Sequence, residues 1–141
     1  MIGRQDQLRR GYTWQELYSS KAIIHLPYEI STMSIFEQYS ANVPMLFPSK
    51  QFLKKLVHDG YQHMNSIYGP YENQNIEWWI DRADFYDEEN MPYIIYFNSE
   101  DDLNEKIKTV DFQQVSKMME SFNEIRERSA KEKWERLIQS I

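Results

Sequence analysis

Two glutamates eight positions apart, Glu29 and Glu37, are the residues whose types and spacing best suit chemistry in this chain. They stand in the stretch LPYEISTMSIFEQYSA, where Glu37 falls inside a predicted helix and Glu29 precedes it. At 1.5 Å per residue, this spacing puts the second carboxylate about 12 Å further along the helix axis, too far for a close catalytic dyad. A carboxylate accepts hydrogen bonds from both hydroxyls of a diol, so each glutamate suits a sugar ring of its own.

The elements around these glutamates predict where such a site lies. Short apolar runs at residues 22–26 and 43–48 read as buried strands, and residues 31–41 between them read as a helix. Strands that alternate with helices favour a parallel sheet, which binds ligands beyond the carboxyl ends of its strands. The backbone amides that open the helix after the first strand carry partial positive charge and suit a diphosphate.

The whole chain reads as one α/β domain, residues 1–141, with a Rossmann-like parallel sheet and flanking helices. Residues 11–60 are predicted as helix, strand, helix, strand and helix, and carry the candidate site. Residues 61–90 are predicted as an irregular segment with a short helix. Residues 91–141 are predicted as a third strand, an acidic helix and a long C-terminal amphipathic helix.

Local signals support several of these helix boundaries. Thr13 and Glu16 have the spacing of a capping box, and Ser49 and Ser99 each precede a predicted helix. Ser31 and Thr32 are both good caps for the helix that holds Glu37. Gly60 stands where a helix would end.

Composition excludes several classes of protein. The 141 residues have a net charge of −6, which argues against bulk electrostatic binding of nucleic acid, and no cysteine, which excludes a disulfide scaffold. The basic clusters QLRR and SKQFLKK remain candidate anion contacts. No apolar run approaches the roughly 20 residues that span a bilayer, and the first residues lack the apolar stretch of a signal peptide. We therefore expect no transmembrane segment and a cytoplasmic protein.

The site-bearing stretch resembles the donor-binding half of GT-B-fold glycosyltransferases, particularly retaining enzymes with an E-x7-E motif. The sequence LPYEISTMSIFEQYSANVPMLFPS keeps the glutamate spacing, small residues before the next strand and the Val-Pro entry into that strand. Further on, YIIYFNSEDDLNEKI resembles the later strand and acidic helix of that family. The long terminal helix also has a counterpart there, so the resemblance covers most of the chain.

The resemblance implies transfer of a sugar from a nucleotide-diphosphate donor to a hydroxyl acceptor. It assigns the nucleotide ribose to Glu37 and the donor sugar, with a catalytic role, to Glu29. The diphosphate would face the amides of Ser31, Thr32 and Met33, and Tyr28 completes the donor-binding set. It implies no metal and no cofactor besides the donor.

This sequence departs from the family pattern in ways that favour an alternative. Ile30 and Thr32 replace two glycines of the motif, and Asn42 replaces a third, although asparagine tolerates a left-handed conformation. The upstream basic pair of the family is not matched by the spacing of Arg4, Arg9 and Arg10. The alternative is a catalytically inactive remnant that serves as a structural or protein-interaction module.

An apolar stripe on the C-terminal helix predicts a partner. Apolar residues recur at three- and four-residue steps, and include Phe122, Ile125 and Trp134. The last helix of the GT-B fold crosses back to the N-terminal acceptor domain, which this sequence does not contain. The stripe is therefore expected to meet an acceptor-domain partner or a second copy of the chain.

Overall fold

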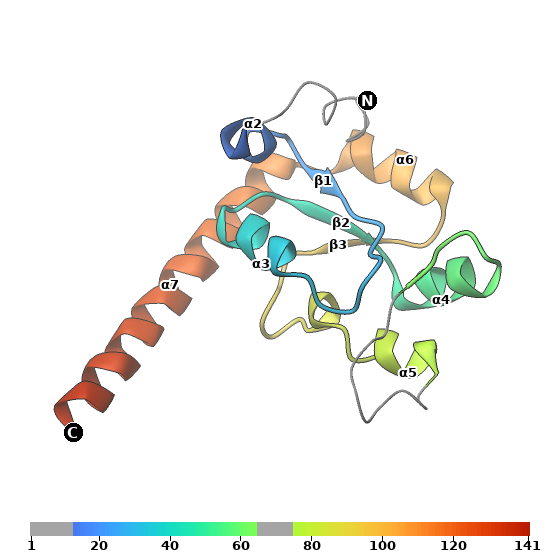
Figure 1. The fold of residues 1–141 in the computed structure, drawn as a ribbon. Coiled ribbons are helices and arrows are strands. Elements are labelled where there is room, and N and C mark those ends of the chain that lie inside the picture. Colours follow the sequence, from blue (N-terminus) through green and yellow to red (C-terminus); the bar gives the residue numbers. More distant parts are fainter. Residues whose placement is uncertain (1–12, 65–74) are drawn as a thin grey trace.

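The computed structural model describes residues 13–64 and 75–141, and its centre is a three-stranded parallel sheet in the order β1-β2-β3 (Figure 1). The strands are β1 (Ile23–Ile24), β2 (Met45–Pro48) and β3 (Ile95–Phe97). Ile23 pairs with Met45 between the first two strands, and Leu46 pairs with Ile95 between the last two. The prediction of an α/β fold with a parallel sheet is confirmed.

Helices follow each strand, as parallel connections require. In chain order the helical elements are α2 (Trp14–Tyr18), α3 (Met33–Ser40), α4 (Lys50–His58), α5 (Ile76–Ile80), the 3-10 helix η2 (Asp84–Tyr86), α6 (Glu100–Thr109) and α7 (Phe112–Gln139).

Most predicted helix boundaries are confirmed by their caps. Thr13 and Glu16 form a reciprocal capping box at α2. Ser49 accepts from the amide of Phe52, and Ser99 caps α6, whose first turn carries three acidic residues. Gly60 follows α4 with a φ of 77°, a left-handed conformation that glycine adopts without strain.

The central strand β2 divides the core into two clusters because its side chains alternate between the two faces of the sheet. Met45 and Phe47 belong to the larger cluster, which α3, α4, α5 and α7 help to build, and Leu46 belongs to the smaller one, beside α6. All four residues of β2 are buried. Such burial on both faces explains why VPMLFP lacks the polar alternation of a half-exposed strand.

Three predictions from the sequence need correction. The single short helix predicted within residues 61–90 is two separate pieces, because α5 ends at Ile80 and the η2 turn follows it. The first strand is shorter than the apolar run that predicts it, because only Ile23 and Ile24 form the ladder. Thr32 occupies the N-cap of α3, but its side chain makes no capping hydrogen bond.

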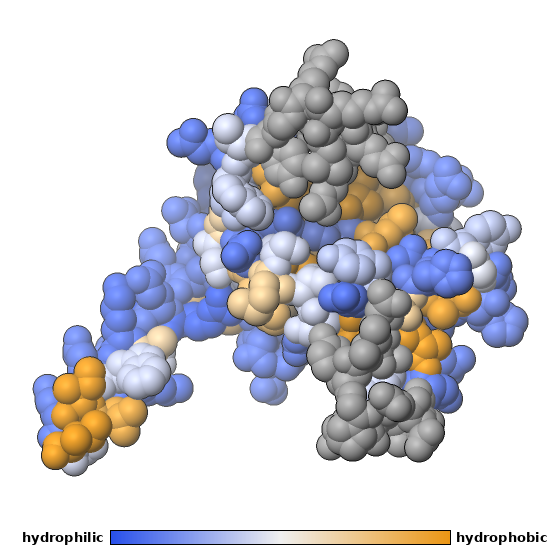
Figure 2. Space-filling view, viewed as in Figure 1, coloured by the Kyte–Doolittle hydropathy of each residue, from blue (hydrophilic) through white to orange (hydrophobic). Residues whose placement is uncertain are grey.

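The prediction of a long C-terminal helix is confirmed, and only its first half packs on the body. Phe112 and Met119 are buried, whereas Ile125 and Trp134 are each 65% exposed. The second half of α7 projects away from the sheet (Figure 1), and its end carries a group of apolar atoms (Figure 2). Arg4, Arg9, Arg10 and part of the predicted irregular segment lie outside the described residues.

Candidate functional site

A pocket of about 230 Å³ lies at the carboxyl end of β1, between the loop that leaves this strand and helix α3. The loop supplies one wall and α3 the other. The lining residues are Ile24, His25, Leu26, Pro27, Tyr28, Thr32, Ser34, Ile35 and Gln38. This is the edge of a parallel sheet where ligands are expected to bind.

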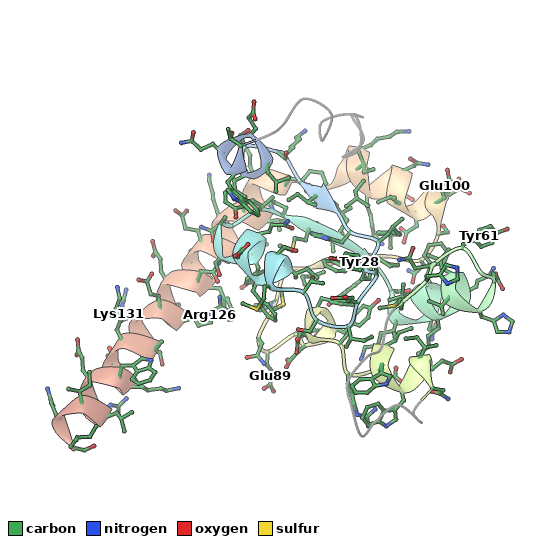
Figure 3. All side chains as sticks on the ribbon, in the orientation of Figure 1. Tyr28, Tyr61, Glu89, Glu100, Arg126 and Lys131 are labelled. Atoms are coloured by element: carbon green, nitrogen blue, oxygen red, sulfur yellow. The ribbon has the colours of Figure 1, made fainter. Side chains whose placement is uncertain are left out.

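Long-range contacts hold the loop between β1 and α3 in place. The amide of His25 donates to the carbonyl of Leu46 at 2.9 Å, and the His25 ring stacks on Phe47 with ring centres 4.7 Å apart. The carbonyl of Pro27 accepts from Nε2 of Gln62 at 2.7 Å. Ile30 is 6% exposed and packs into the larger core cluster. The pocket wall is therefore anchored on both sides of Tyr28, which Figure 3 labels.

The start of α3 forms the second wall. Thr32 has an extended φ of −130°, and its carbonyl accepts the amide of Ile35 at 3.1 Å. Because the Thr32 hydroxyl does not cap the helix, it leaves the first amides of α3 available to other acceptors. The aligned peptide dipoles of this eight-residue helix add partial positive charge at its N-terminus.

Gln38 contributes a buried polar group that sequence reasoning missed. Its side chain lines the pocket and is only 7% exposed, and its Oε1 has no hydrogen-bond partner within the described part of the chain. A buried amide oxygen without a partner costs free energy that a ligand donor can recover. The sequence feature that could have identified Gln38 as a pocket residue is its spacing, since it lies four residues after Ser34 on the same face of α3.

The structure brings some of the predicted site residues together and leaves others outside the pocket. Tyr28 and Thr32 line it. Glu29 is half-buried in an isolated bridge, and Glu37 is exposed.

Ser31 and Met33 flank Thr32 without lining the pocket. Ser31 is half-buried, and the Met33 side chain is 75% exposed. The resemblance would place the backbone amides of these residues, and not their side chains, against a diphosphate.

The lining is polar but carries no carboxylate, lysine or arginine among the described residues. Its hydroxyls and the Gln38 amide suit the neutral hydroxyl and amide groups of a sugar or a nucleobase. Within residues 13–64 and 75–141, no group of three or more histidine, aspartate or glutamate side chains is arranged to hold a metal ion.

A second pocket of about 230 Å³ follows the next strand, β2, and carries a basic residue. Ser49, Lys50, Tyr86, Glu88 and Tyr96 line it. Nζ of Lys50 donates to the carbonyl of Asp81 at 3.3 Å and lies 5.5 Å from the ring centre of Tyr86. Because adjacent parallel strands end at one edge of a sheet, both pockets belong to the same edge.

Comparisons of the chain with protein-family models, with curated proteins and with solved structures found no match. Among the helices of the described residues, none combines the length and the apolar composition needed to cross a membrane.

Proposed function

We propose that this chain is a glycosyltransferase-like domain that binds a nucleotide-diphosphate sugar at the β1–α3 pocket. The observation that carries the proposal is the buried, unpartnered Oε1 of Gln38 in a polar pocket at the carboxyl end of a parallel strand. The E-x7-E spacing supports it from the sequence. Both lines point to a ligand with many hydroxyl and amide groups.

In this proposal the donor extends from the pocket along the start of α3. The amides of Ser31, Thr32 and Met33 face the diphosphate. Glu37 lies three residues after the pocket-lining Ser34, on a neighbouring position of the helix surface. A ribose at the pocket rim therefore comes within reach of its exposed carboxylate.

The proposed reaction replaces the bond between the anomeric carbon and the diphosphate with a bond to an acceptor hydroxyl oxygen, and the hydroxyl proton is released. Negative charge grows on the leaving diphosphate, where the amides of α3 stabilise it. Glu29 is proposed to contact the donor sugar as the catalytic residue. A separate N-terminal acceptor domain supplies the acceptor, and no metal is required in this scheme.

The proposal includes a cellular compartment, argued from the cysteine content of the chain. A chain of 141 residues without cysteine suits a reducing environment. We therefore place this donor-binding domain in the cytoplasm.

Thermal unfolding with and without ligand tests donor binding. UDP, GDP or ADP, or one of their sugars, at millimolar concentration should raise the melting temperature, because a ligand that binds only the folded chain stabilises it. Glu37→Ala should abolish that increase. Glu120→Ala is the matched control, since Glu120 is an exposed helical glutamate on α7. An unchanged melting temperature with all three nucleotide classes would contradict the proposal.

One observation favours the alternative, an inactive module that keeps the fold. Ile30, which stands where the family has a glycine, fills the core with a buried side chain instead of opening the backbone to a phosphate. Under this alternative, no nucleotide raises the melting temperature, and Glu29→Gln and Glu37→Ala change neither stability nor binding of a partner protein.

A further inference from the structure

The last turns of α7 stand clear of the body. Every residue from 130 to 141 is exposed, although the same helix buries Phe112 and Met119 near its start. At 1.5 Å per residue the 28-residue helix is about 42 Å long, so its second half extends well past the sheet (Figure 1). This part of the helix has water on all sides.

Apolar side chains gather on one side of the exposed end. They are Trp134, Leu137, Ile138 and Ile141, with exposures of 65%, 51%, 66% and 100%. We call these four residues the tip. Their spacing of three, one and three residues confines them to a sector about 100° wide. Figure 2 shows the resulting group of apolar atoms at the free end of the helix.

Two lysines border the tip, Glu132 and Glu135 lie further round the helix, and Glu127 lies on the side of the tip about two turns earlier. At 100° per residue, Lys131 falls beside Ile138 and Lys133 falls on the other flank, beside Leu137. Glu132 lies on the opposite side of the helix from the tip. The arrangement is an apolar face with a lysine at each border.

The charge of this segment differs in sign from that of the whole chain. Residues 130–141, the part that stands clear of the body, contain three basic and two acidic side chains, a net charge of +1, whereas the full chain carries −6. Lys131 makes an exposed ion pair with Glu127 at 2.7 Å (Figure 3 labels Lys131), and such surface pairs contribute little and exchange readily. Both border lysines can therefore meet anionic groups outside the protein.

We propose that the tip docks on an anionic phospholipid surface. An apolar face that carries tryptophan inserts at the boundary of headgroups and acyl chains, while lysines beside it reach lipid phosphates. Charge complementarity selects this occupant: the anionic leaflet attracts the positive helix end and repels the acidic body, which keeps α7 as the contact. A second copy fits less well, because the border lysines of two copies would face each other over only four apolar side chains.

Flotation with lipid vesicles tests the proposal on the full chain. Vesicles of phosphatidylcholine and phosphatidylglycerol in roughly equal amounts should carry the protein, and phosphatidylcholine vesicles should carry much less. Added salt should weaken the binding because it screens the lysines. Tryptophan emission should shift to the blue with the mixed vesicles in the natural chain and not in Trp134→Phe. Equal flotation with both vesicle types would overturn the charge argument.

Variants separate the roles of the tip and the lysines. Trp134→Glu should weaken vesicle binding at least about tenfold, because it places a charge in the apolar face. The double change Lys131→Gln and Lys133→Gln should weaken it about 25-fold, at about fivefold for each lysine. Arg136→Gln is the matched control on the far side of the helix and should leave binding nearly unchanged. All these side chains are exposed, so the fold should tolerate each change.

Self-association is the competing outcome, and the same variants detect it. Three results together would show that the tip is a contact between copies: the natural chain sediments as a dimer, Trp134→Glu is monomeric, and no vesicle carries the natural chain. The lipid proposal would then be wrong. Equal vesicle binding by the natural chain and Trp134→Glu would also overturn it, because another surface would then hold the lipid.

Discussion

Asn123 on α7 donates from Nδ2 to Oδ1 of Asn42, 2.7 Å away, across 81 positions of sequence. The same Nδ2 also donates to the carbonyl of Tyr39 at 3.0 Å, and Ser116 donates to the carbonyl of Asn42 at 2.7 Å. The turn that ends α3 is thus fixed by two residues of α7. This connection joins the helix of the candidate site to the helix that projects from the body.

Asn42→Ala should lower the free energy of unfolding by about 1–3 kcal/mol, because Asn42 has a φ of 60° and its side chain accepts the Asn123 bond. Asn42→Gly relieves the backbone strain but loses the same hydrogen bond, so its loss should be smaller. Urea unfolding followed by circular dichroism measures both. A loss in the glycine variant as large as that in the alanine variant would contradict a contribution from the backbone.

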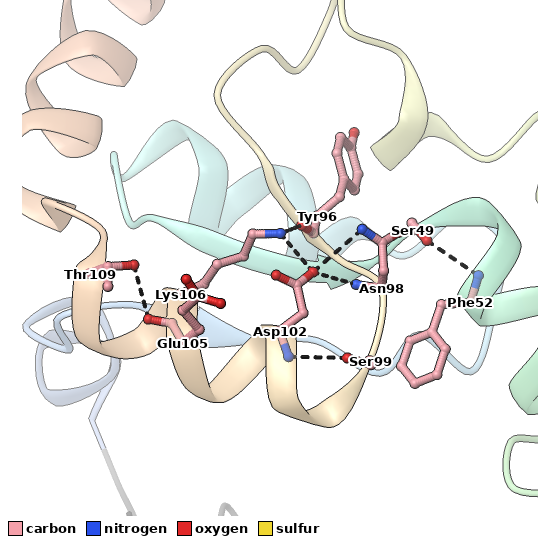
Figure 4. Close-up of polar contacts among 9 residues, drawn as sticks. All are labelled: Ser49, Phe52, Tyr96, Asn98, Ser99, Asp102, Glu105, Lys106 and Thr109. Atoms are coloured by element: carbon pink, nitrogen blue, oxygen red, sulfur yellow. Dashed lines mark hydrogen bonds and ion pairs between the residues drawn. The ribbon is translucent and has the colours of Figure 1, made fainter.

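Acid should destabilise the chain through Asp102. This carboxylate accepts from Lys106 at 2.8 Å and from the amide of Asn98 at 2.7 Å, and Lys106 also donates to the carbonyl of Tyr96 (Figure 4). The Lys106 hydrogen bond, followed by the Asn98 amide, lowers the pKa of Asp102 below its usual 3.8. The contribution to stability is therefore complete above pH 3.8 and disappears as the pH falls through the lowered value.

Asp102→Asn should lower the melting temperature at neutral pH and make its fall in acid shallower. Melting temperatures measured from neutral pH down to about pH 2 check this. Asp101→Asn is the control, since Asp101 is an exposed residue of the same helix turn. The same acid dependence in the natural chain and in Asp102→Asn would show that the contacts in Figure 4 contribute nothing measurable.

Alkali should destabilise the chain through buried tyrosines, which include Tyr39, Tyr96 and Tyr86. Tyr39 donates to the carbonyl of Pro92 at 2.7 Å, and Tyr96 donates to the carbonyl of Phe85 at 2.8 Å. Burial raises the pKa of each from 10.0 to about 12. The folded chain therefore holds protons that the unfolded chain releases, and stability should fall as the pH rises from 10 towards 12.

Tyr39→Phe should make this alkaline loss of stability less steep, because the variant lacks one of the hydroxyl groups whose pKa is raised in the folded chain. Urea unfolding at a series of alkaline pH values measures the slope, and absorbance near the phenolate band follows ionisation. Tyr61→Phe should leave the slope unchanged, since Tyr61 is 79% exposed. An unaltered slope in Tyr39→Phe would refute the role given to Tyr39.

Phe47 should be among the most sensitive core positions. Its ring is fully buried in β2 and stacks between His25 at 4.7 Å and Phe85 at 4.8 Å. Phe47→Ala should cost about 3–5 kcal/mol of unfolding free energy, because it leaves a cavity that the sheet cannot close. Ile125→Ala, at a position 65% exposed, should cost less than about 0.5 kcal/mol. Equal losses in chemical denaturation would contradict the assigned burial.

The pocket shows how far sequence could predict the candidate site. Tyr28 and Thr32 were predicted as site residues and do line the pocket, because chain proximity to the strand end already places them there. Gln38 was missed, since a glutamine in a helix looks solvated until the sheet buries one face of that helix. The roles of Glu29 and Glu37 stay predictions that ligand binding must decide.

The sequence by itself determined the local structure: the α/β order, the three strands and the caps at Thr13, Ser49 and Ser99. These features depend on residues within one helical turn or on the apolar content of a short run, so they can be predicted from the sequence alone. Only the tertiary structure decided that Asn42 meets Asn123, that Gln38 is buried and that the packing of α7 on the body stops before its last turns. Those outcomes depend on packing between segments far apart in sequence, which hydrophobic spacing along a single helix does not encode.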